Sequence, residues 1–261
     1  MAKSASSEMP FLDHLEELRV RILWSLGAIC VGVAIAFWVM TTWDVITLLE
    51  RPIVPYLAGK RLIYTHPGDA FRIVMTLSFT FGVIFALPVI LYQVWGFLSP
   101  ALYQHEKRVV VPVLVVAALL FLAGVAICFL VIMPMILRFL MGFQAGALDP
   151  MITAADYFGF ALSMALAFGA VFELPILVFL LTMLGIVTPE FLNRYRRHAI
   201  VLCMVGSALI TPGADPMSLF ILTIPLYLLF EASVAVSAVV ARAQRRRSAL
   251  AAGDTSEEII A

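Results

Sequence analysis

The sequence has 261 residues, 63% of them hydrophobic and only 13% charged, and its net charge is zero. A soluble domain carries about 25% charged residues, so the composition excludes an ordinary soluble protein. The balanced charge excludes a protein built to bind nucleic acid. Three stretches, at 22–43, 73–105 and 109–137, contain no Asp, Glu, Lys or Arg. Each is long enough to cross a bilayer, and a lipid-embedded backbone of this kind must be helical.

The first predicted element is an amphipathic helix at the N-terminus. Phe11, Leu12, Leu15 and Leu18 recur at helical spacing within residues 1–21. This pattern predicts a helix that lies on the bilayer surface and runs into the first membrane span.

The fold predicted for the rest of the chain is an all-α, polytopic membrane protein with six transmembrane helices. Some helices are kinked at proline, and helices 5 and 6 are short. A short interfacial helix is expected at 43–49. Residues 1–240 form one transmembrane domain, and the basic and then acidic tail at 241–261 is expected to be disordered. The six helices are predicted at about 22–42, 71–97, 109–137, 156–184, 198–211 and 217–240.

The distribution of basic residues predicts the orientation. With six spans and the N-terminus inside, twelve of the 17 Lys and Arg residues fall in inside segments. Cytoplasmic loops carry an excess of Lys and Arg, so both termini should be cytoplasmic. Helices as short as the fifth cross a bilayer only where it is locally thinned or where neighbouring helices shield them.

An internal similarity links residues 69–100 with residues 156–189. Matched Asp, Gly and Pro residues indicate a parallel repeat, the alternative being coincidence in a sequence of few residue types. The informative mismatch is Ala86 in the first copy against Glu173 in the second.

Glu173 is a carboxylic acid within a predicted span. Such groups are costly in lipid and usually face a partner or a cavity. Pro175, two residues later, has no N–H, so the carbonyl of Val171 loses its helical partner and the helix is expected to kink. The functional interpretation is a docking or gating site for a polar side chain from another membrane helix. The structural alternative is a hydrogen bond inside the bundle.

A second polar group is predicted on the cytoplasmic side, from two separate segments. Carboxylates are the natural bidentate partners of guanidinium groups, so two acids there suit a pair of arginines. The alternative is that these charges are simply solvated. The members are Glu16, Glu17, Arg19, Tyr103, His105 and Glu106.

No catalytic or nucleotide-binding motif appears in the sequence, which favours a protein that is not an enzyme and needs no cofactor or metal.

Four segments, in order, resemble the TatC family of twin-arginine protein translocase subunits. They are His14–Arg21 (HLEELRVR), Leu87–Arg108 (LPVILYQVWGFLSPALYQHEKR), Phe168–Pro175 (FGAVFELP) and the turn at Thr211-Pro212. The resemblance implies a receptor in the bacterial inner membrane that binds twin-arginine signal peptides. It also implies assembly in the lipid bilayer with TatA/TatB-type single-span proteins and with other copies of itself. Such a complex moves folded proteins using the proton-motive force.

The resemblance also implies roles for particular residues. Glu17 and Glu106 would read the arginine pair, and Glu173 would meet a polar residue of a partner helix. The family often has Gln early in helix 6, where this chain does not. The signal-peptide site would be supported by Arg19, Phe97, Tyr103 and His105. Thr211 and Ser218 would substitute for the missing Gln. Pro52 matches a position that the family ties to assembly.

Two other functions are alternatives to this hypothesis. A small-solute secondary transporter would fit the repeat, the prolines and the intramembrane acid, but it needs more polar groups to coordinate a solute. An intramembrane enzyme would need a nucleophile with a base, or a pair of acids, and the sequence shows neither set.

Overall fold

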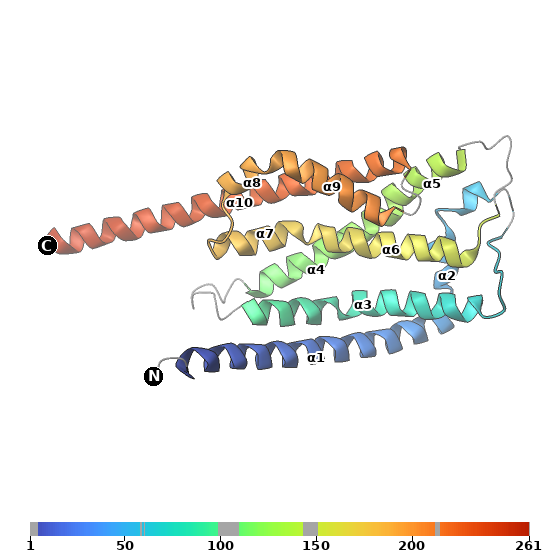
Figure 1. Cartoon of the computed structure of the whole chain (residues 1–261), viewed down its shortest axis with the longest axis horizontal. Coiled ribbons are helices and arrows are strands. Elements are labelled where there is room, and N and C mark those ends of the chain that lie inside the picture. The colour runs from blue at the N-terminus through green and yellow to red at the C-terminus, as the bar shows by residue number, and fades with distance from the viewer. Residues whose placement is uncertain are drawn as a thin grey trace.

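The computed structural model describes residues 5–57, 59, 61–98, 110–142, 151–211 and 215–260, with side chains described from residue 15 to residue 246 except at Leu98 and Val110. Within these ranges the chain is an all-helical bundle (Figure 1). Its elements are α1 (Ala5–Thr42), α2 (Val45–Glu50), a 3-10 turn (Val54–Tyr56), α3 (Asp69–Leu98), α4 (Val110–Ile127), a π-helical turn (Cys128–Ile132), α5 (Met133–Gly142), α6 (Ala154–Phe172), α7 (Leu174–Met183), α8 (Pro189–Arg194), α9 (Arg196–Ile210) and α10 (Pro216–Ile260).

Five helical segments of the described chain are long and apolar enough to cross a membrane. The chain is therefore a polytopic, α-helical membrane protein. In contrast, α9 has only 15 residues, which rise about 22 Å at ~1.5 Å per residue. The five segments are Leu15–Thr42, Asp69–Phe97, Val111–Gly142, Ala154–Met183 and Pro216–Arg246.

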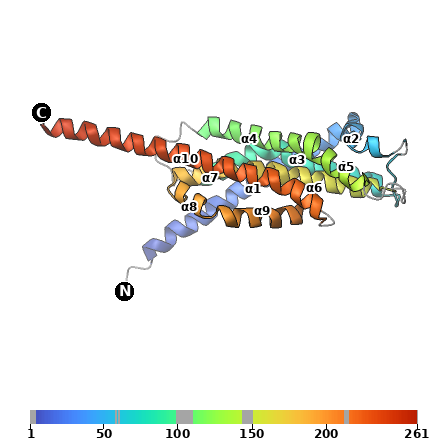
Figure 2. The same cartoon turned by 90° about the horizontal axis from the view of Figure 1, so that it is seen from above.

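The bundle has two distinct ends. α2 and α5 lie at one end, called here the α2 end, and α8 lies at the other, called the α8 end (Figure 1). Both α1 and the projecting part of α10 point out of the α8 end (Figures 1 and 2). Since α1 begins there and α10 ends there, the two ends of the described chain share one side of the bundle.

Glycines allow helices to pack with their backbones in contact. α1 and α3 lie side by side (Figure 1), and a Cβ on Gly32 of α1 would collide with the carbonyl oxygen of Gly82 in α3. Small residues of this kind are the usual means by which membrane helices approach closely. The α4–α6 contact uses them too, because the ring of Phe121 covers Gly169.

Hydrogen bonds join α6 to α2 and to the segment that contains Ile63 at the α2 end. Tyr157 of α6 is buried, and its hydroxyl donates a 2.8 Å hydrogen bond to the carbonyl of Leu49 in α2. Ile63 is bridged to the segment before α6, since the N–H of Ala154 donates to the Ile63 carbonyl at 2.7 Å. The first of these bonds gives a partner to the carbonyl of Leu49, near the end of the short helix α2.

Three sequence predictions require correction. The N-terminal segment does not form a separate surface helix, because α1 is one continuous helix from Ala5 to Thr42. The sixth helix is not short, since α10 has 45 residues. The tail predicted to be disordered is helical through Ile260.

Composition and contacts explain the longer α10. Residues 241–251 are rich in Ala and Arg, which are strong helix formers, and contain no Gly or Pro. The extension also contacts the end of α7 and the helix α8. Gln244 donates from Nε2 to the carbonyl of Met183 at 3.2 Å, and Arg245 pairs with Glu190 at 3.2 Å.

Candidate functional site

A polar pocket lies between α1 and α3 at the α8 end. Its volume is about 540 Å³, and it contains two carboxylates from α1 and one amide from α3. An opening with two acids on an otherwise apolar bundle is suited to a cationic ligand. The lining residues are Glu16, Glu17, Val20, Arg21, Trp24 and Gln93.

Arg21 fixes the Glu17 carboxylate within this pocket. Its Nε donates to Glu17 Oε1 at 3.0 Å, and its Nη2 contacts the same oxygen. On the other side, Arg21 Nη1 reaches Gln93 Oε1 of α3 at 3.4 Å. The guanidinium lies against Gly96, where any side chain would collide with it. Gly96 therefore keeps a site open for a guanidinium between the two helices.

Sequence reasoning missed the roles of Arg21 and Gln93. The spacing of Glu17 and Arg21 was an available signal, because residues four apart on a helix face each other. Gln93 had no local signal, since its place in the pocket depends on how α3 packs against α1.

The predicted signal-peptide residues fall into three groups. Glu17 lines the pocket, whereas Arg19 is exposed and does not line it. Phe97 is partly buried on α3, one helical turn beyond Gln93. The other three predicted residues, Tyr103, His105 and Glu106, lie outside the described residues.

Glu173 separates α6 from α7, as the sequence predicts. Its backbone stays in the right-handed helical region, but its ψ of −13° is less negative than the helical average, and Pro175 lies in the first turn of α7. Pro88, at the matching position of α3, lies inside an unbroken helix. The side chain of Glu173 is partly exposed, but its Oε1 atom is buried and has no hydrogen-bond partner in the described structure.

Thr211 and Ser218 flank the turn between α9 and α10, at the α2 end. Both are buried, at 4% and 0% exposure. The Thr211 hydroxyl donates to the carbonyl of Ser207 at 2.8 Å, and the backbone N–H of Ser218 donates to Asp215 Oδ1 at 2.7 Å. The two residues therefore lie at the adjoining ends of α9 and α10, whereas Glu173 lies where α6 meets α7.

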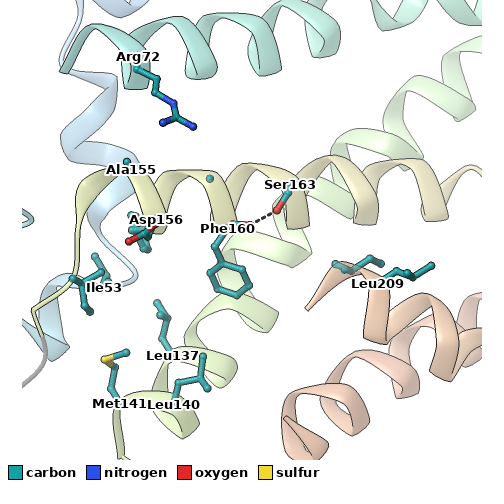
Figure 3. A pocket seen from close by; sticks show the side chains of 14 residues that line it. Ile53, Arg72, Leu137, Leu140, Met141, Ala155, Asp156, Phe160, Ser163 and Leu209 are labelled. Atoms are coloured by element: carbon teal, nitrogen blue, oxygen red, sulfur yellow. Dashed lines mark hydrogen bonds between the residues drawn. The ribbon is translucent and has the colours of Figure 1, made fainter. Parts of the chain in front are cut away.

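A larger cavity, of about 730 Å³, opens at the α2 end. Its lining includes Arg72 of α3 and Asp156 of α6 together with apolar side chains such as Phe160, Leu140 and Leu209, all labelled in Figure 3. Asp156 accepts a 2.6 Å hydrogen bond from Thr153. Ile53 lines the cavity, so Pro52, the predicted assembly residue, is next in sequence to its wall.

Comparisons with known proteins agree with this architecture. The family model for Sec-independent protein translocase protein (TatC) matches residues 13–225. The TatC protein of Aquifex aeolicus is 36% identical over 239 residues, covering 91% of this chain and 98% of its own. The TatC protein of Escherichia coli is 37% identical over 232 residues, covering 88% and 89%. A crystal structure of the twin-arginine translocase receptor TatC superposes with a TM-score of 0.78 at 36% identity, covering 87% of this chain and 99% of that one.

Proposed function

Because the chain belongs to the TatC family, and is thus a twin-arginine translocase subunit of the bacterial inner membrane, we propose that it is the receptor that binds twin-arginine signal peptides. The family is one of translocase receptor subunits, not of enzymes or small-solute transporters. In this proposal the α8 end faces the cytoplasm, where precursor proteins arrive, and α9 forms a sixth, short span. The excess of Lys and Arg in the segments at this end supports that orientation.

The observation that carries the proposal is the pocket at the α8 end. Glu17 already holds a guanidinium there, that of Arg21, in a charge-assisted contact. An incoming arginine needs the same partner in the same geometry, and Glu16 adds a second carboxylate to the pocket. Glu106, from the segment after α3, is proposed to complete the pair of acids that reads two adjacent arginines. Arg19, Phe97, Tyr103 and His105 are proposed to support it.

Replacing the arginine pair of a signal peptide by two lysines is expected to weaken its binding at least about tenfold. A lysine ammonium is a point charge and cannot make the bidentate contact of a guanidinium. Fluorescence anisotropy of labelled peptides with the detergent-solubilised full-length chain measures both affinities. Equal affinities for the two peptides would remove the receptor proposal.

Glu173 is proposed to be the contact for a TatA/TatB-type single-span partner. Its side chain is only partly buried and lies at a break in an apolar helix, so a polar group of a neighbouring helix has access to it.

Thr211 and Ser218 are proposed as a second contact, at the α9–α10 turn. Pro52 is proposed to act in assembly with other copies of the chain, and the proton-motive force is proposed to drive transport.

Glu173→Ala is expected to weaken partner association about 5- to 30-fold, since an interhelical hydrogen bond in a membrane contributes about 1–2 kcal/mol. Glu173→Gln retains a hydrogen-bonding group and should lose less. Co-purification of the partners from membranes measures the effect. Glu231→Gln is the matched control, because Glu231 bonds within the chain to Arg196 and Tyr227. Normal association of the Glu173→Ala variant would return Glu173 to a purely structural role.

A further inference from the structure

Two of the buried polar atoms that have no hydrogen-bond partner within the described residues line one cavity. They are Nε1 of Trp95 in α3 and Oε1 of Glu173 between α6 and α7. The cavity has a volume of about 200 Å³, and its remaining lining is apolar, from α3, α4, α6 and α7. An indole N–H is a donor only, whereas a carboxyl oxygen accepts, so the two atoms are complementary.

Leaving either atom unpaired is unfavourable. A buried polar group without a partner loses its hydration and gains nothing in return. Trp95 is only 5% exposed, so its N–H has no access to bulk solvent or to lipid headgroups. Among the described residues, no other polar side chain lines the cavity. Within this part of the chain, the two atoms can therefore find a common partner only in a molecule inside the cavity.

We propose that this cavity is an internal water site in which water bridges Trp95 Nε1 and Glu173 Oε1, and that Trp95 positions the Glu173 carboxyl. The volume is sufficient, because a water in the liquid occupies about 30 Å³ and needs polar partners to remain. The bridge links α3 to the break between α6 and α7. It holds one carboxyl oxygen inward while the side chain stays partly exposed. This inference concerns the resting chain and does not depend on the partner contact proposed above.

The proposal explains why the two copies of the repeat differ here. The first copy has Ala86, which is 3% exposed, where the second has Glu173. Trp95 belongs to the first copy, where it precedes Gly96, and the residue that precedes the matching Gly185 in the second copy is the apolar Leu184. The polar pair is therefore formed between the copies, by packing of α3 against α4, α6 and α7.

The test uses the full-length chain in lipid nanodiscs with Trp24, Trp38 and Trp43 replaced by Phe, so that Trp95 is the only indole. Ultraviolet resonance Raman spectroscopy reports whether the indole N–H is hydrogen-bonded, and transfer to D2O reports whether water reaches it. We expect a hydrogen-bonded N–H that exchanges. Ala117→Leu, which fills the cavity from α4, should weaken the bond and slow the exchange. A free N–H in the parent chain, or signals unchanged by Ala117→Leu, would overturn the proposal.

A second measurement covers the case in which Ala117→Leu does not fold. Trp95→Phe keeps an aromatic ring but removes the N–H donor. The infrared band of the Glu173 carboxyl group, identified by its loss in Glu173→Gln, is expected to shift in Trp95→Phe. Phe160→Leu, a change in α6 that lines the larger cavity at the α2 end and not this one, serves as the control and should leave the band in place. A band unmoved by Trp95→Phe would show that Trp95 does not position the carboxyl.

Discussion

Glu17→Ala is expected to weaken binding of a twin-arginine signal peptide by about 10- to 100-fold, because a hydrogen bond to a charged group contributes about 1.5–3 kcal/mol. The substitution also leaves Arg21 without its carboxylate partner, so the pocket, whose charged lining residues are Glu16, Glu17 and Arg21, loses its net negative charge. Both effects oppose a cationic ligand. Peptide anisotropy with the solubilised chain measures the loss.

The matched control is Glu190→Ala. Glu190 is an acid at the same end of the bundle, outside the pocket, and its side chain is 66% exposed. A hydrogen bond from its own backbone N–H, with further contributions from Thr188 and Arg245, lowers the pKa of its carboxyl. Glu190 is therefore ionised at neutral pH, and its replacement removes one negative charge from this end of the bundle. Its replacement is expected to leave peptide affinity unchanged. Equal losses in the two variants would mean that the peptide senses only the overall charge of this end.

Gly32→Ala is expected to lower the free energy of unfolding by about 1–3 kcal/mol, the usual range for overpacking a closely packed contact. The added methyl group would collide with the Gly82 carbonyl, so α1 and α3 must separate. Gly82→Ala should act in the same way, because its Cβ would lie 2.6 Å from the backbone nitrogen of Val33. Thermal unfolding in a fixed detergent measures both.

Gly27→Ala provides the control for this contact. Gly27 lies on the same helix, and a Cβ there meets nothing within 4 Å. The two substitutions in α1 alter helix propensity equally, so the difference between them isolates the contact with α3. If Gly27→Ala and Gly32→Ala shift unfolding to the same extent, the close approach of α1 and α3 does not stabilise the chain. Because the proposed peptide pocket lies between these helices, Gly32→Ala is also expected to reduce signal-peptide affinity.

Local signals in the sequence were sufficient for several features. Charge-free stretches predicted the long apolar helices, because exclusion of charge from lipid acts on each segment separately. The interruption at Glu173 was predicted because Pro175 removes a donor within the same turn. The tail was predicted wrongly, since its charges suggested disorder while its Ala and Arg residues favour a helix continuous with α10.

The sequence by itself determined that this chain is a helical membrane protein with an acid in an apolar span and with acids beside its spans. Which of these groups meet was decided only by the tertiary structure. Arg21 meets Gln93 because Gly32 and Gly82 allow α1 and α3 to touch, and Trp95 shares a cavity with Glu173 because α3 packs near α7. Hydropathy and proline act within a few residues, whereas such contacts join residues far apart in the chain. They follow from the packing of whole helices, which no local pattern encodes.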